Sequence, residues 1–368
     1  MSEVLIMTLA HDIHAHCVAS ALESRGHIVK RWIGDRFPSA QSTSLWLCQD
    51  SDPYGVVREG QESIGLSESV DVVWLRRPRW PVTPDKLLPE DKEPAAFELK
   101  EWYRSLCGSS WQSARWVNSI AGRRAANNKI LQLKLARQVG LIIPSTLVSN
   151  EPAEVRRFVS GARTVVKPFY TQSWQEQDGL FHSFTAAIDL DRLPADEYIA
   201  ACPAIYQREV VKHFEVRAFF CGNSVQSIAL HSQDNKESAS DWRTVDPALL
   251  SPHPIKMPNS VQNSCLRLMK SLGIVTGSFD FAVTKSGEWV FFEVNEQGQF
   301  LWMEEVSPET TVLDMFVNFI ESPDPEGFCY IQKSGMHRFA ETLRSARVKE
   351  LAEQDAMGAL GGIPLAML

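Results

Sequence analysis

The segment Ser278–Asn295, SFDFAVTKSGEWVFFEVN, decides the fold of this chain of 368 residues. Apolar residues dominate on both sides of Lys285–Glu288, which contains a glycine, and this pattern predicts a β-hairpin. If those four residues form the loop, counting back along both strands places Asp280 directly opposite Glu293. The Cβ atoms of such a pair lie about 5 Å apart.

The two faces of this predicted hairpin differ in chemistry. By period-two alternation, Asn295 joins Asp280 and Glu293 on one face. The other face is apolar and contains Phe279, Phe281, Val283, Val290, Phe292 and Val294. Facing carboxylates on a half-buried sheet repel unless a proton or a cation lies between them. Oxygen ligands without His or Cys favour Mg²⁺, which proteins often bind through one or two carboxylates together with nucleotide phosphates.

The hairpin therefore predicts a magnesium site for a nucleotide, and the alternative is a carboxylate pair at a solvated edge.

Side chains that could contact the phosphates of this nucleotide occur upstream in the sequence. Lys129 lies within a helical pattern from about Arg123 to Val139, and Lys167 ends the strand-like segment Thr164–Lys167. A lysine that closes an apolar strand is often only a snorkelling side chain. Arg217, in a strand that alternates Glu and Arg with apolar residues, could hold a phosphate.

The composition indicates a multi-domain globular protein. With 44% hydrophobic residues the chain can bury two or three cores of ordinary domain size. No apolar run approaches the roughly 20 residues needed to cross a bilayer, and the N-terminus has no export signal. Seven scattered cysteines without a Cys-x-x-Cys pair are typical of reduced thiols in the cytoplasm. A net charge of −8 argues against nucleic acid or an anionic membrane as a partner.

The periodicity changes along the chain. A β-α-β pattern opens it over residues 4–33, without the Gly-rich turn of a dinucleotide-binding unit. Strand-like segments between residues 145 and 230 indicate an antiparallel α+β region. Beyond Pro325 the pattern predicts an amphipathic helix over about residues 336–354 and then an apolar tail.

Taken in order, these motifs resemble those of a glutathione-synthetase-like ATP-grasp ligase. The order is Lys129, Lys167, residues 207–210 (QREV), Glu215-x-Arg217, Arg243, Asp280 and Glu293-x-Asn295. Within that superfamily the sequence is most similar to the ligases that mature microviridin-type peptides, the graspetide synthetases. The narrower resemblance rests on the motifs DIHA (12–15), VWLRRP (73–78) and NEQGQFLWME (295–304), and it spans about residues 4–319.

The resemblance implies an α/β and α+β multi-domain architecture, an ATP-grasp fold with an N-terminal Rossmann-like pre-ATP-grasp domain. We expect that domain in residues 1–120, a central ATP-grasp subdomain in 121–205, a C-terminal ATP-grasp subdomain in 206–325, and an appended helix and tail in 326–368. We further expect ATP and Mg²⁺ as cofactors, a cytoplasmic location and a homodimer.

The resemblance also implies a role for each candidate site residue. The residues expected to bind the nucleotide are Lys129 and Lys167 at the phosphates, Gln207, Glu209 and Val210 at the adenine, and Glu215 near the ribose. The residues expected to ligate Mg²⁺ are Asp280, Glu293 and Asn295. The residues expected to neutralise the transferring phosphoryl group or the acyl phosphate are Arg217 and Arg243.

The implied function is that of an ATP-dependent carboxylate ligase that forms ADP and phosphate. It would activate Asp or Glu side chains of a ribosomal precursor peptide as acyl phosphates and join them to Thr, Ser or Lys side chains as ω-esters or ω-amides. Arg76 and Arg77 lie in a basic loop that could dock the carboxylates of that peptide. The alternative for this loop is a solvated one whose Arg stems cover apolar surface.

Other readings of the chain stay open at this point. One is a small-molecule amino-acid or dipeptide ligase with the same ATP site, and another is a non-catalytic nucleotide-binding partner protein. His11, His14 and His16 form a cluster after the first strand, but no carboxylate or Cys pattern of a metal site accompanies them. Packing at a helix start is favoured for these histidines.

Overall fold

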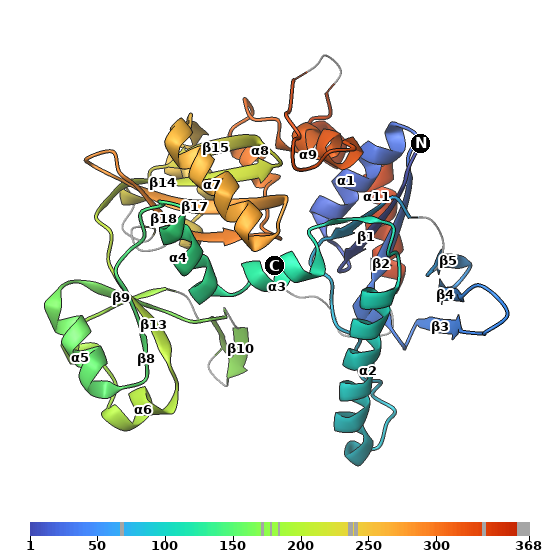
Figure 1. The fold of residues 1–368 in the computed structure, drawn as a ribbon, viewed down its shortest axis with the longest axis horizontal. Coiled ribbons are helices and arrows are strands. Elements are labelled where there is room, and N and C mark those ends of the chain that lie inside the picture. Colours follow the sequence, from blue (N-terminus) through green and yellow to red (C-terminus); the bar gives the residue numbers. More distant parts are fainter. Residues whose placement is uncertain are drawn as a thin grey trace.

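The computed structural model describes residues 1–66, 70–170, 173–176, 179–182, 185–234, 238, 242–332 and 336–358. It is a mixed α/β fold of several units, as predicted (Figure 1). In this view the N-terminal sheet lies on the right, and the sheet that contains β14, β17 and β18 lies at the upper left. A smaller unit with α5 and α6 lies below that second sheet.

A parallel sheet forms the centre of the N-terminal unit, with the strand order β2-β1-β6-β7. Its elements are β1 (Glu3–Thr8), α1 (Ile13–Ser24), β2 (Ile28–Ile33), β6 (Val72–Leu75) and β7 (Arg115–Val117). Asp12 caps α1, because its carboxylate accepts a hydrogen bond from the Ala15 N–H at 3.1 Å. The predicted β-α-β start is confirmed, and α1 begins at the carboxyl end of β1.

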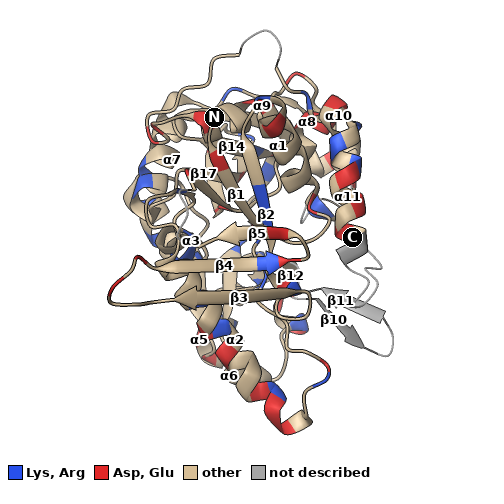
Figure 2. Ribbon diagram, turned by 90° about the vertical axis from the view of Figure 1, so that its right-hand side faces the viewer, with Lys and Arg blue, Asp and Glu red and all other residues tan. Residues whose placement is uncertain are grey.

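A second, antiparallel sheet lies beside β2 (Figure 2). Its strands are β3 (Gln41–Trp46), β4 (Tyr54–Glu59) and β5 (Glu62–Gly65). Val57 and Ile64 of this sheet share a core with Trp32 of β2 and with Tyr103 of α2 (Pro89–Ser109). The two sheets of the N-terminal unit are thus joined by apolar packing.

One helix is predicted over about residues 123–139, but the structure has two helices in this region. The prediction of a single continuous helix is therefore wrong. The helices are α3 (Ile120–Ala126) and α4 (Lys129–Gln138). Asn128 separates them and caps α4, since its side chain accepts a hydrogen bond from the Leu131 N–H at 3.0 Å. Lys129 is consequently the first residue of α4.

The central unit is an antiparallel sheet with the order β12-β9-β13-β8. Its elements are β8 (Thr146–Ser149), α5 (Pro152–Gly161), β9 (Thr164–Lys167), β12 (Ala186–Ile188), α6 (Asp196–Ala201) and β13 (Ala204–Arg208). A hairpin of β10 (Ser173–Glu176) and β11 (Gly179–His182) follows β9 in the chain. Val155 and Val159 of α5 and Ile199 of α6 pack on Tyr206, so both helices cover one face of the sheet.

The C-terminal unit is built on a five-stranded antiparallel sheet with the order β16-β15-β14-β17-β18. Its elements are β14 (Lys212–Cys221), β15 (Ser224–Leu230), β16 (His253–Pro254), α7 (Asn259–Leu272), β17 (Thr276–Thr284), β18 (Trp289–Asn295), α8 (Trp302–Val306) and α9 (Val312–Glu321). Leu268 and Met269 of α7 share a core with Phe279 and Phe281 of β17. Phe316 of α9 belongs to a different core, which it shares with the N-terminal unit.

The hairpin β17–β18 has the predicted central pair but not the predicted loop. Asp280 pairs with Glu293, as counted from the sequence. Val283 pairs with Trp289, so the loop is one residue longer than predicted. A β-bulge after Asp280 compensates for this shift, because it accommodates Phe292 as an extra residue on β18.

The C-terminal helices return to the N-terminal unit, beside α1 (Figure 2). They are α10 (Phe339–Leu343) and α11 (Ala346–Gly358), so the single helix predicted over 336–354 is wrong. Phe339, Val348 and Leu351 share a core with Leu22 of α1. The last ten residues of the predicted apolar tail, 359–368, lie outside the described residues. None of the described helices has the length and apolar character of a membrane span.

Candidate active site

A row of three charged side chains crosses the sheet of the C-terminal unit. The strand registers pair Arg217 of β14 with Asp280 of β17, and Asp280 with Glu293 of β18. Arg217 is buried, its Nη1 donates to Asp280 Oδ2 at 2.8 Å, and its Nη2 donates to the carbonyl oxygen of Gln299 at 3.0 Å. The predicted convergence of the two acids is confirmed, and Arg217 holds one of them in place.

Asp280 has the features of a cation ligand. Its Oδ1 is buried and has no hydrogen-bond partner among the described residues. Burial raises the pKa of Asp280 above its ordinary value, Arg217 counteracts the rise, and the Glu293 carboxylate adds to it. A divalent cation would give the buried Oδ1 of Asp280 the partner that it lacks, so the oxygens of this pair fit Mg²⁺.

No group of three or more His, Cys, Asp or Glu among the described residues could hold a metal ion by itself. Two carboxylates are nevertheless sufficient for Mg²⁺ when phosphate oxygens and water complete the coordination shell. The donor set at Asp280 and Glu293 therefore fits a nucleotide-bound cation better than a structural metal centre.

Glu293 is flanked by two cations at the limit of ion-pair distance. Lys129 Nζ lies 3.9 Å from Glu293 Oε2, and Arg243 Nη1 lies 3.9 Å from Glu293 Oε1. Lys129 also donates to the carbonyl oxygen of Pro168 at 3.1 Å. A lysine at the first position of a helix is opposed by the helix dipole, so its placement there favours a binding role. At 3.9 Å neither contact is a hydrogen bond, so Lys129 and Arg243 lie beside Glu293 as neighbouring charges.

These residues line a cavity of about 650 Å³, which is within the usual size range of nucleotide and cofactor sites. Lys167, at the end of β9, lies over the Phe292 ring with Nζ 4.7 Å from the ring centre. The prediction that Phe292 belongs to the apolar face is wrong, because the β-bulge turns it into the cavity and leaves Phe291 in the core.

The connection from β13 to β14 lines another wall of the cavity. Gln207 is buried, and its Nε2 donates to Thr146 Oγ1 at 3.0 Å. Glu209 lies beyond the end of β13, where its N–H donates to the Arg163 carbonyl oxygen at 3.0 Å. Val210 follows on the same wall. The structure therefore brings the three predicted adenine-contact residues to the cavity that Lys129 and Lys167 also line.

Glu215 is buried, lines the cavity and belongs to a polar cluster. Its Oε1 accepts hydrogen bonds from Lys212 Nζ at 2.7 Å and from Ser232 Oγ at 2.7 Å. Burial raises the pKa of Glu215, and the contact with Lys212 opposes that rise. Lys212 also lines the cavity. Lys212 is not predictable from the sequence as a site residue, because a lysine at the start of a strand carries no distinctive signal.

The loop after β18 is held from three directions. Asn295 is exposed, and its Oδ1 accepts a hydrogen bond from the Gln297 N–H at 3.0 Å. Arg76 Nη1 donates to the Gln297 carbonyl oxygen at 2.5 Å, and Arg76 Nε lies 3.2 Å from Asp12 Oδ2. Arg76 is only 1% exposed, so in this conformation it positions the loop, whereas the neighbouring Arg77 is half-buried.

His14 provides the third anchor of this loop. Its Nε2 accepts hydrogen bonds from the N–H groups of Phe300 at 2.9 Å and Leu301 at 3.1 Å, which requires the neutral ring. Burial lowers the pKa of His14 well below its ordinary value, and Arg76 adds to the effect. The expectation that the histidines pack at a helix start is confirmed for His14 and His16, which are both buried in α1.

Acidification is expected to weaken the fold through His14. Since the pKa of His14 is depressed in the folded state, its contribution is complete above the unfolded pKa of about 6.5 and is lost as the pH falls below it. The midpoint of thermal unfolding should therefore fall more steeply between about pH 7 and pH 5 in the wild type than in His14→Gln, whose amide stays neutral. Equal slopes for the two proteins would rule out this assignment.

Comparison with known proteins adds a family model and several solved structures. The model described as the MvdD pre-ATP grasp domain matches residues 3–124. The macrocyclase MdnC from Microcystis aeruginosa MRC, solved with its precursor peptide MdnA, is 27% identical, with a TM-score of 0.76 over 87% of this chain and 99% of that one. No curated protein matches the sequence.

Two further solved structures share the fold at lower identity. The RiPP-associated ATP-grasp ligase from Chryseobacterium gregarium, in complex with ADP and a leader and core peptide, is 23% identical and has a TM-score of 0.81 over 88% of this chain and 98% of that one. The ATP-grasp ligase PsnB, complexed with a minimal precursor, Mg and ADP, is 20% identical and has a TM-score of 0.65 over 87% of this chain and 96% of that one.

Proposed function

Since this chain is an ATP-dependent ligase of the ATP-grasp fold with an MvdD pre-ATP grasp domain, we propose that its substrate is a ribosomally made precursor peptide. Asp or Glu side chains of the peptide are activated as acyl phosphates and joined to Thr or Ser as ω-esters or to Lys as ω-amides. The observation that supports the chemistry best is the row of Arg217, Asp280 and Glu293 beside a cavity lined by Lys129 and Lys167.

The precursor peptide as substrate is supported by the likeness to MdnC. That enzyme is 27% identical over nearly its whole length and was solved with a precursor peptide. In a ligase of this kind, ATP with Mg²⁺ would supply a phosphoryl group to a carboxylate oxygen, so that phosphate can leave when the acceptor attacks the acyl carbon. Asp280, Glu293 and Asn295 would hold the cation, because they present oxygen atoms at the edge of the cavity.

The remaining site residues act by position and charge. Lys129 and Lys167 would neutralise phosphate oxygens, while Gln207, Glu209 and Val210 would bind the base and Glu215 would lie near the ribose. Arg243, whose side chain is 45% exposed, would meet the charge that develops on the transferred group. Arg217 contributes by fixing Asp280 in place.

Docking of acidic peptide side chains is assigned to the basic loop after β6. Arg77 is half-buried, and it is the residue of this loop that would contact the substrate carboxylates. Arg76 would have to break its contacts with Asp12 and Gln297 to take the same role. Its geometry therefore favours a structural role, in which Arg76 holds the loop after β18 in place.

The function is tested with the short peptide encoded beside the gene, if it is rich in Thr or Ser and in Asp or Glu. With ATP and Mg²⁺ we expect ADP release and a peptide mass that falls by one water for each link. Turnover with free amino acids or dipeptides alone would instead identify a small-molecule ligase. Nucleotide binding without turnover of any acceptor would identify a non-catalytic protein.

A further inference from the structure

The C-terminal helix is joined to the N-terminal unit by a fully buried carboxylate. Asp355 of α11 is 0% exposed. Its Oδ2 accepts a hydrogen bond from the His11 N–H at 2.9 Å and lies 2.7 Å from His16 Nε2. Arg31 Nη1 lies 3.0 Å from Oδ2, and Arg36 Nη2 lies 3.3 Å from Oδ1. Two of these four groups belong to the segment His11–His16 at the start of α1.

The same segment carries the groups that hold the loop after β18. Asp12 pairs with Arg76, which binds the carbonyl oxygen of Gln297. His14 accepts hydrogen bonds from two N–H groups at the end of the loop, those of Phe300 and Leu301. The segment His11–His16 therefore lies between Asp355 on one side and the loop on the other.

The loop in turn borders the proposed nucleotide site. It begins directly after Asn295, and Gln297 lines the cavity. The carbonyl oxygen of Gln299 accepts a hydrogen bond from Arg217, the residue that also holds Asp280. A continuous path of hydrogen bonds and buried chain thus runs from α11 to the predicted metal ligands.

We propose that Asp355 is a positioning residue for the ligase reaction, which fixes the start of α1 and, through His14 and Arg76, the loop that completes the nucleotide site. This inference rests on the proposed function for its kinetic consequence. An ångström-scale displacement of groups around a reacting centre can cost ~100-fold in rate, so a distant support of this kind can matter. A coupling path also needs direct tests at both of its ends.

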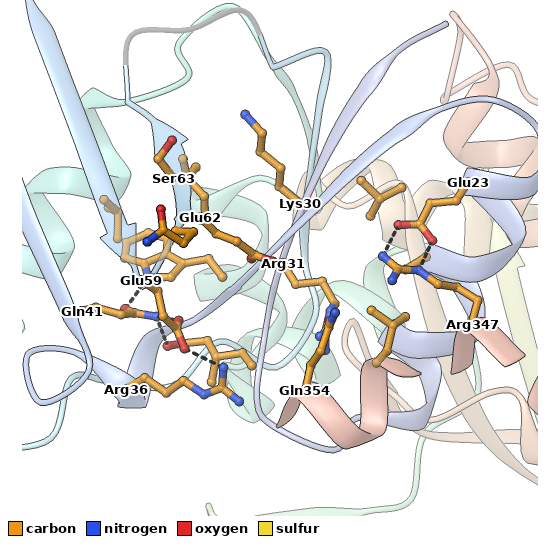
Figure 3. A pocket seen from close by; sticks show the side chains of 18 residues that line it. Glu23, Lys30, Arg31, Arg36, Gln41, Glu59, Glu62, Ser63, Arg347 and Gln354 are labelled. Carbon is orange, nitrogen blue, oxygen red and sulfur yellow. Dashed lines mark hydrogen bonds and ion pairs between the residues drawn. The ribbon is translucent and has the colours of Figure 1, made fainter. Parts of the chain in front are cut away.

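The surroundings of Asp355 make a folded variant accessible. Arg31 and Arg36 line a cavity of about 610 Å³ between β2, the β4–β5 hairpin and α11 (Figure 3). Water in this cavity can hydrate both guanidinium groups when the carboxylate is replaced, so Asp355→Asn is expected to fold. The pair Glu23–Arg347, at 2.7 Å, also joins α1 to α11 but does not touch the segment His11–His16 (Figure 3). Glu23→Gln is therefore a matched control.

The test combines amide hydrogen exchange with kinetics on the full chain. In Asp355→Asn we expect the amides of Phe300 and Leu301 to exchange about tenfold faster and kcat for ADP release with the precursor peptide to fall about tenfold, with KM for ATP nearly unchanged. In Glu23→Gln both quantities should stay within about twofold of the wild type. Arg31→Gln, which removes one donor to Asp355, should show the same changes at smaller size.

Three results would overturn the inference. The first is unchanged exchange at residues 300 and 301 in Asp355→Asn, the second is unchanged kcat in that variant, and the third is an equal loss of kcat in Glu23→Gln. If the wild type has no turnover with any peptide, the proposed function fails. Hydrogen exchange, measured with AMPPNP and Mg²⁺ as probes, then decides the inference by itself.

Discussion

Replacing Glu293 with Gln is expected to lower kcat for ADP release by at least ~100-fold, while the fold stays intact. The change deletes one negative charge at nearly constant volume. Glu293 is paired with Asp280 across β17 and β18, and its side chain is 32% exposed, so glutamine should fit without strain. Steady-state ADP release with saturating peptide and Mg²⁺ measures the effect, and circular dichroism verifies the fold.

Glu288→Gln is the matched control for this variant. Glu288 lies in the loop of the same hairpin, is exposed, and forms hydrogen bonds with Thr284 and Ser286 of that loop. The substitution has the same chemistry but does not reach the cavity, so kcat should be unchanged. Activity in Glu293→Gln that equals that of Glu288→Gln would remove Glu293 from the proposed ligand set.

Replacing Arg217 with Gln is expected to cost both activity and stability. The side chain is buried, and its loss leaves the Asp280 carboxylate and the Gln299 carbonyl without their donors. Breaking a buried ion pair by removing one partner costs about 3–5 kcal/mol of unfolding free energy, and the partial exposure of Asp280 at 15% places the effect towards the lower end. Denaturant unfolding without nucleotide measures the change.

A double-mutant cycle with Asp280→Asn separates pairing from other effects of the arginine. Asparagine carries no charge to compensate, so the double variant should be less destabilised than the sum of the single variants. The interaction free energy should exceed about 1 kcal/mol. Strict additivity would show that Arg217 and Asp280 do not support one another, contrary to the 2.8 Å contact.

The sequence was most informative where local periodicity and a single loop determine the outcome. Asp280 and Glu293 share a short hairpin, so counting residues was enough to pair them, and the structure confirms the pair. The fold class and the ATP-grasp ligase assignment are likewise confirmed by the structure and its relatives. The correct pairing was nevertheless reached from a wrong loop length, because the bulge at Phe292 restored the register.

The failures have one local and one long-range physical cause. The break at Asn128 is local, because a side-chain cap outweighs a continuous helical pattern. The burial of Arg76 depends on Asp12 and on a loop more than 200 residues away, which no local pattern reveals. The domain boundaries and the roles of the individual site residues stay predictions.

The C-terminal helices illustrate the same limit. Their polar pattern favours an appended segment, yet Asp355 is buried among His16, Arg31 and Arg36 of the N-terminal unit. A single acidic residue in an amphipathic helix is indistinguishable from a solvated one until its partners are known. Long-range packing therefore decided which charged residues became structural.

Calorimetric titration with AMPPNP, with and without Mg²⁺, tests most directly whether Asp280 and Glu293 hold a nucleotide-bound cation. We predict tight binding with Mg²⁺, at least ~10-fold weaker binding without it, and loss of that difference in Glu293→Gln. Equal affinity with and without the cation in the wild type, or an undiminished effect of Mg²⁺ in Glu293→Gln, would contradict the proposed site.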